Sequence, residues 1–211
     1  SKVSGIPAEE FRIVSEDLAG FGIPAEAVTI EGYLFPATYS FDTEASATDI
    51  IQAMVSRMKD ELERLGVAEK DWHSVLTLAS IVQREAKLEE DFYKVSRVFA
   101  NRIAIDMRLE TDPTISYSYS GKDMSELSKA KQLEHGYNTY LIKGLPPGPI
   151  ASPGALALEA TLSPSDGDWL FFVTINLETG ETKFSRTLAE HESYVVFLRQ
   201  WEKENPGWYD N

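Results

Sequence analysis

Apolar residues recur every three to four positions in three long stretches of the chain, residues 46–65, 72–85 and 92–103. This spacing places the apolar side chains on one face of an α-helix, so each stretch is predicted to be a helix with one buried stripe. Ser46 or Thr48 can cap the first stretch with its hydroxyl, and Gly66 stands where many helices end. The pattern therefore predicts three consecutive amphipathic helices.

Shorter elements flank these helices. Residues 7–19, 155–162 and 188–202 show helical spacing, residues 169–175 form the clearest strand, and a turn leads back into residues 182–185 as a hairpin. The side chains of the last helix that we expect to pack inward are Tyr194, Val195, Phe197, Leu198 and Trp201. The predicted fold class is α+β, with helices packed around a small antiparallel sheet.

Residues 110–154 lack this periodicity and are rich in Thr, Asp, Pro, Tyr, Asn and Gly, although residues 125–132 could add a short helix. Long ordered loops in compact domains are usually functional. The alternative is a flexible surface insertion, but the proline density favours a rigid wall. We therefore expect a long ordered active-site loop region, with a cleft between residues 137–154 and the end of the helix at 72–85.

The composition excludes several classes of function. With 20 basic and 34 acidic residues among 211, the net charge is -14, so nucleic-acid binding is not expected. Cysteine is absent, and the three histidines, His73, His135 and His191, do not have the spacing of metal ligands, so we predict no metal and no cofactor.

No apolar run approaches the roughly 20 residues that cross a bilayer, so the chain as given is expected to be soluble. It starts without a methionine, which is compatible with an upstream segment that includes a membrane anchor.

Glu85 is the strongest candidate for chemistry. It falls three, four and seven positions after Val82, Ile81 and Leu78, and so continues the apolar stripe of its helix. A carboxylate in that position is expected to have a raised pKa, which a general acid requires. Helical phase alone leaves open that Glu85 instead pairs with a buried arginine or caps the next segment.

Seven sequence blocks in order between residues 31 and 191 carry a resemblance to a known family. They are EGYLFPATY (31–39), LASIVQRE (78–85), VFANR (98–102), TDPT (111–114), YNTY (137–140), GLPPGPI (144–150) and LAEH (188–191). Together they resemble the MltG-type (YceG-like) endolytic murein transglycosylases.

The resemblance implies an enzyme without a cofactor that cuts nascent peptidoglycan glycan strands between N-acetylmuramic acid and N-acetylglucosamine and leaves a 1,6-anhydro-muramyl end. The catalytic acid of the family maps onto Glu85. This chain has Gln83 where the family block has a first Glu, so Glu85 is the one carboxylate of that block. It also has Glu110 where family members often carry Gln, which leaves the role of Glu110 open.

Polar and aromatic residues of the other blocks and of the loop are the candidates for substrate binding. They are Asn101, Thr111, Asp112, Tyr137, Asn138, Thr139, Tyr140 and Ser152. Asn138 and Tyr137 could stabilise positive charge on the sugar. If Asp112 or Glu110 supplies a second carboxylate, the enzyme is instead a water-using muramidase. A third possibility is a peptidoglycan-binding module without turnover.

The resemblance also implies the place of the chain in a larger protein. An N-terminal transmembrane helix and a LysM-like subdomain belong to the family, so residues 1–30 are expected to be a remnant of a flanking subdomain or a linker. Residues 31–205 are then the catalytic domain and 206–211 a tail. The whole protein is expected to be a single-pass membrane protein whose catalytic domain lies on the outer face and meets glycan strands and the cell-wall synthesis machinery.

Overall fold

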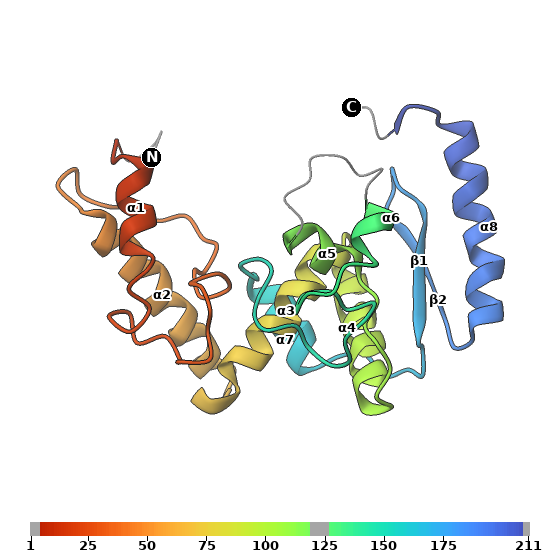
Figure 1. Cartoon of the computed structure of the whole chain (residues 1–211), viewed down its shortest axis with the longest axis horizontal. Coiled ribbons are helices and arrows are strands. Elements are labelled where there is room, and N and C mark those ends of the chain that lie inside the picture. The colour runs from red at the N-terminus through yellow and green to blue at the C-terminus, as the bar shows by residue number, and fades with distance from the viewer. Residues whose placement is uncertain (1–4, 119–126, 209–211) are drawn as a thin grey trace.

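A computed structural model describes residues 5–118 and 127–208 and has an α+β fold, as predicted. Three parts lie side by side along the long axis in Figure 1. At one end are α1 (Ala8–Val14) and α2 (Ala47–Arg64), and the centre holds α3 (Trp72–Glu85), α4 (Glu89–Ala104) and α7 (Ala155–Leu162). At the other end is a hairpin of β1 (Phe171–Asn176) and β2 (Glu181–Ser185), followed by α8 (Leu188–Glu204).

The three long helices form where the apolar periodicity predicts them. Ser46 and Asp49 make a capping box at the start of α2, and Gly66, with φ of +73°, follows its end. The first helix is shorter than predicted, because α1 ends at Val14 and the chain turns where the Asp17 carboxylate accepts a hydrogen bond from the Gly20 N–H at 2.9 Å. A one-turn 3-10 helix, η1 (Glu69–Asp71), leads into α3.

One hydrophobic core runs through the N-terminal and central parts. It takes Leu76, Ile81 and Val82 from α3 and packs them with buried residues of α2, α4 and α7. Phe21 and Ile23, which lie in the stretch expected to be a flanking remnant, are buried in this same cluster. Residues 5–30 therefore contribute directly to the core that supports α3.

The region expected to be a loop contains a helix that was not predicted. α5 (Asp112–Ser118) starts with Pro113 in its first turn, a position that proline suits because the N–H it lacks has no partner there. The short helix expected at 125–132 is observed as α6 (Leu127–Ala130), and its expected start at Ser125 lies outside the described residues. Asn138, Thr139 and Ile150 are buried, which supports an ordered wall over a flexible insertion.

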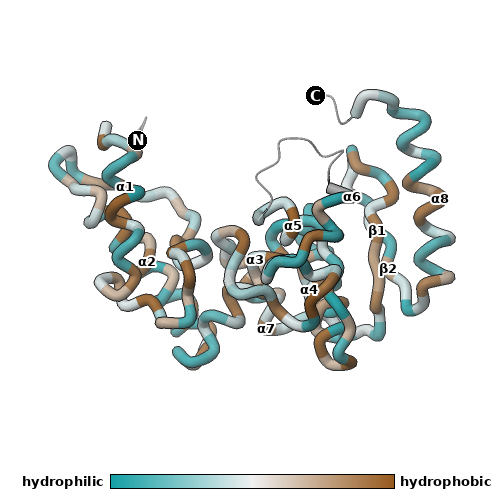
Figure 2. The backbone as a smooth tube through the Cα atoms, in the orientation of Figure 1, coloured by the Kyte–Doolittle hydropathy of each residue, from teal (hydrophilic) through white to brown (hydrophobic). Residues whose placement is uncertain are grey.

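The sheet has two strands within the described residues. β1 and β2 pair antiparallel with Phe172 opposite Phe184, and the predicted start at Trp169 was two residues early. α8 runs along the hairpin on the side away from the central helices (Figure 1). The prediction that Phe197 packs inward was wrong, because its side chain is 55% exposed. Figure 2 shows hydrophobic and hydrophilic residues alternating along α8. This helix packs against the small two-stranded sheet.

None of the helices in residues 5–118 and 127–208 combines the length and the apolar character that crossing a membrane requires.

Candidate active site

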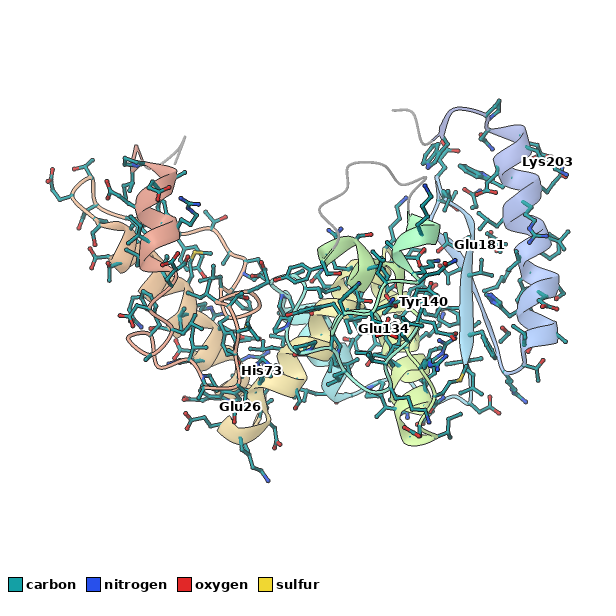
Figure 3. The ribbon with its side chains drawn as sticks, viewed as in Figure 1. Glu26, His73, Glu134, Tyr140, Glu181 and Lys203 are labelled. Carbon is teal, nitrogen blue, oxygen red and sulfur yellow. The ribbon has the colours of Figure 1, made fainter. Side chains whose placement is uncertain are left out.

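Glu85 is the last residue of α3, and its carboxyl group lines a cavity of about 350 Å³. One wall consists of the end of α4 and residues 109–112, and a second consists of the hairpin and the start of α8. Tyr140 completes the lining. The cavity is lined by Glu85, Phe99, Arg102, Leu109, Glu110, Thr111, Asp112, Tyr140, Phe171, Phe172, Leu188 and His191. Tyr140 lies between the central helices and the hairpin in Figure 3.

The surroundings of Glu85 favour its neutral form. Burial raises the pKa of Glu85 from its ordinary value of 4.5 to about 7, and the nearby Asp112 carboxylate adds to the rise. A hydrogen bond from Thr111 and the charges of Arg102 and Arg84 act in the opposite direction. A carboxyl group with this pKa carries a proton in part of the molecules at neutral pH and can act as both a general acid and a general base.

A buried cluster of three threonines fixes the hydroxyl that contacts Glu85. Thr111 donates a hydrogen bond from Oγ1 to Glu85 Oε1, and its own N–H donates to Thr139 Oγ1 at 3.1 Å. Thr114 Oγ1 donates to the Thr111 carbonyl at 2.8 Å and lies 2.9 Å from Thr139 Oγ1. The expected site residues Thr111 and Thr139 are thus brought together, with Thr111 beside the acid and Thr139 behind it.

Asp112, Tyr140 and Lys131 form a second group beside Glu85. The Tyr140 hydroxyl donates to Asp112 Oδ1, and Lys131 Nζ lies 2.7 Å from the same oxygen and 4.4 Å from the centre of the Tyr140 ring. Burial and the hydrogen bond to Asp112 raise the pKa of Tyr140, so its hydroxyl remains a donor. This group holds one carboxylate and one phenol at the rim of the cavity.

Arg102 anchors the wall opposite Glu85, although the sequence reasoning gave it no role. Its guanidinium donates to the carbonyls of Leu170 at 2.7 Å and Leu109 at 2.8 Å, and lies 3.6 Å from a Glu110 carboxylate oxygen. Glu110 has φ of +50°, a left-handed conformation that is uncommon for a residue other than glycine. The backbone at the cavity edge is therefore held in a conformation that needs the surrounding bonds to maintain it.

Five of the expected substrate-binding residues do not line this cavity: Thr139, which lies behind Thr111, and Asn101, Tyr137, Asn138 and Ser152. Asn101 donates to the carbonyls of Gly167 and Trp169 at 3.2 and 2.9 Å, and Ser152 donates to Glu31 at 3.3 Å. The Tyr137 ring packs against Tyr117 with 5.1 Å between centres. Asn138 is fully buried and makes its hydrogen bonds within the protein.

The cavity therefore differs from the expected cleft, because Tyr140 is the one residue of the stretch 137–154 that lines it. The sequence reasoning missed the wall made by the hairpin and by α8. Phe171, Phe172, Leu188 and His191 belong to that wall. The block LAEH at 188–191 was the one sequence signal that pointed to it.

We expect two conservative substitutions to move the pKa of Glu85 in opposite directions. Thr111→Val removes a hydrogen bond to the charged form and should raise this pKa, whereas Asp112→Asn removes a nearby negative charge and should lower it, each by roughly one pH unit. An NMR titration of the Glu85 carboxyl carbon measures both. Asp106→Asn, which removes an exposed carboxylate paired with Lys143, is the control and should change nothing. Two changes of the same sign would contradict the assignment of these causes.

The sequence of this chain is similar to those of known proteins. A family model described as the YceG-like family matches residues 6–196. A protein of Bacillus subtilis (strain 168) named endolytic murein transglycosylase is 40% identical over 175 residues, which cover 79% of this chain and 48% of that protein. A protein of the same name from Streptococcus pneumoniae serotype 2 (strain D39 / NCTC 7466) is 31% identical over 177 residues, 79% of this chain and 32% of that protein.

A crystal structure of a yceG-like protein from Listeria monocytogenes has a similar fold. The TM-score is 0.67 at 34% sequence identity, over 90% of this chain and 65% of that one. The chain thus spans about half of one of these curated relatives and a third of the other.

Proposed function

Because the chain belongs to the YceG-like family, we propose that it is the catalytic domain of an endolytic peptidoglycan lytic transglycosylase that uses Glu85 as its acid and its base. The observation that carries the proposal is one carboxyl group with a pKa of about 7 in a cavity of 350 Å³, within the segment that the family model matches. The relatives so named are two to three times longer than the segment that they share with this chain.

The proposed reaction needs one ionisable group in two states. Protonated Glu85 gives its proton to the oxygen that links N-acetylmuramic acid to N-acetylglucosamine, and the bond from that oxygen to the muramyl C1 breaks. The Glu85 carboxylate then takes the proton of the muramyl C6 hydroxyl, whose oxygen bonds to C1. The product is a 1,6-anhydro-muramyl end, Glu85 is protonated again, and no water is consumed.

The other carboxylates of the cavity have partners, which favours this route over hydrolysis by two carboxyl groups. Asp112 accepts from Tyr140 and pairs with Lys131, and Glu110 lies 3.6 Å from Arg102. A muramidase would need one of them to activate water or attack the sugar. We propose instead that Asp112 offsets the positive charge that develops on the muramyl ring.

We divide the expected substrate-binding residues into two groups. Thr111, Asp112 and Tyr140 line the cavity and are proposed to meet the glycan or Glu85 directly. The second group is proposed to act by holding the walls in place, and it consists of Asn101, Tyr137, Asn138, Thr139 and Ser152. Nascent glycan strands lie outside the cell membrane, so we propose its outer face as the place of action, in contact with the cell-wall synthesis machinery.

Mass spectrometry of glycan strands digested by the purified chain tests the proposal. We expect new ends that are lighter by one water than ordinary reducing ends, and no such ends with Glu85→Gln. Reducing ends would make the protein a muramidase. Binding of the strands without any new ends would make it a binding module.

A further inference from the structure

His191 lies in the same cavity as Glu85 but comes from the opposite wall, at the start of α8. Its side chain forms no hydrogen bond with any described residue, and its Nδ1 is buried without a partner. Leaving a buried polar atom unpaired normally destabilises a fold, so an unpaired atom in a native structure needs an explanation.

The other two histidines show what a structural role looks like in this protein. His73, which Figure 3 shows between the N-terminal part and the centre, uses both ring nitrogens: Nδ1 lies 3.0 Å from the Tyr33 hydroxyl and Nε2 lies 2.8 Å from the Pro147 carbonyl. His135 Nε2 lies 3.3 Å from the Ser118 hydroxyl, although its Nδ1, like that of His191, is buried without a partner. His191 differs from both, because it connects no segments through its nitrogens.

Ring stacking holds the plane of His191 in place. The imidazole stacks on Phe171 with 5.6 Å between ring centres and 28° between planes, and the Arg102 guanidinium lies 5.2 Å from the centre of that same phenyl ring. Arg102 is in turn fixed by the Leu170 and Leu109 carbonyls. A half-turn of the imidazole about Cβ–Cγ exchanges Nδ1 and Cδ2 without breaking this stack, so the ring can present a nitrogen to the cavity.

The surroundings also favour the uncharged form of the imidazole. Burial and the nearby Arg102 lower the pKa of His191, and Glu192 acts in the opposite direction to a smaller extent. A neutral imidazole offers one N–H donor and one nitrogen acceptor. Hydroxyl and acetamido groups, which N-acetylated sugars carry, are matching partners for such a pair.

From the stacked ring, its unpaired Nδ1 and its place across the cavity from Glu85, we infer that His191 is a substrate-binding residue that hydrogen-bonds a hydroxyl or acetamido group of the sugar and so positions the scissile bond against Glu85. The inference rests on the proposed function, because it takes a glycan as the ligand. It assigns recognition to the α8 wall and proton transfer to the α3 wall.

The test compares His191→Phe, which keeps the stack on Phe171, with His191→Gln, which restores a donor and an acceptor. We expect His191→Phe to raise KM for glycan strands by roughly 3- to 10-fold, the value of one neutral hydrogen bond, with a smaller change in kcat. His191→Gln should recover part of the loss. The control, His135→Phe, lies outside the cavity and should keep parental kinetics. Parental KM in His191→Phe would overturn the inference.

A binding measurement separates this inference from the proposed reaction. In the Glu85→Gln background, where no cleavage is expected, a glycan oligosaccharide without stem peptides should bind more weakly by the same factor when His191→Phe is added. The ring ¹⁵N signals of His191 should also shift when the oligosaccharide binds to Glu85→Gln alone. Unchanged signals would overturn the role of His191 even if His191→Phe proves unstable. Weaker binding with no anhydro ends from the parent would keep that role and reject the reaction.

Discussion

Glu85→Gln should lower kcat for glycan cleavage by roughly 100- to 10,000-fold, the usual contribution of a positioned general acid. Glutamine keeps the size of the side chain and can still accept the hydrogen bond from Thr111, but its amide cannot donate a proton to the glycosidic oxygen. The measurement is the rate at which anhydro ends appear. Glu110→Gln removes a carboxylate from the same cavity and is the matched control, with a much smaller loss expected. Near-parental cleavage by Glu85→Gln would make Glu110 or Asp112 the acid to test.

The same substitution should stabilise the fold at alkaline pH. The pKa of Glu85 is about 7 in the folded chain and near 4.5 in the unfolded one, so between these values the folded state binds more protons. Stability contributed by neutral Glu85 is therefore complete below pH 4.5 and is lost as pH rises through 7. Glu85→Gln avoids this loss, and at pH 8 it should exceed the parent by roughly 1–3 kcal/mol in free energy of unfolding. The difference in urea midpoints at pH 4 and pH 8 measures it.

Regular periodicity made the long helices predictable. The stripe of α3 was strong enough to place Glu85 on the inner face of its helix, where the structure has it beside a cavity. The N-cap of α2 was also predictable, because a serine just before a helical stretch commonly caps the helix with its hydroxyl. In both cases the information lies within a few residues of chain.

The parts that escaped prediction depend on distant contacts. α5 is seven residues long and starts Asp-Pro-Thr, so its apolar residues are too few to show a period, and the buried Ile115 that anchors it meets the core only after folding. Phe171 and His191 become walls of the cavity because the hairpin packs beside α4 and α8 packs on the hairpin. The separation of α3 and α8 along the sequence does not indicate that the two helices line the same cavity.

The surroundings of Asn138 differ from those expected of a residue that meets the substrate. From the sequence, Asn138 is a residue that could stabilise positive charge on the sugar. In the structure its side-chain amide donates to the Lys131 carbonyl at 3.0 Å and the Leu133 carbonyl at 2.8 Å, and its Oδ1 accepts from the Tyr140 N–H at 3.0 Å. Its oxygen and nitrogen are therefore used to shape the loop that presents Tyr140.

Asn138→Ala should consequently unfold at a lower temperature as well as lose activity. The substitution leaves two carbonyls and one N–H without their partners at a fully buried position, which costs about 2–4 kcal/mol of stability. For a chain of this size that corresponds to a fall in Tm of about 5–15 °C by calorimetry. Asn205→Ala, which removes one hydrogen bond to the Trp201 carbonyl at the end of α8, is the control and should change Tm by less than about 4 °C. Activity should fall at temperatures where Asn138→Ala is still folded, because Tyr140 then loses the contact that fixes its backbone. If Tm stays at the parental value while turnover is lost, Asn138 meets the glycan itself, and the loop opens further than this structure has it.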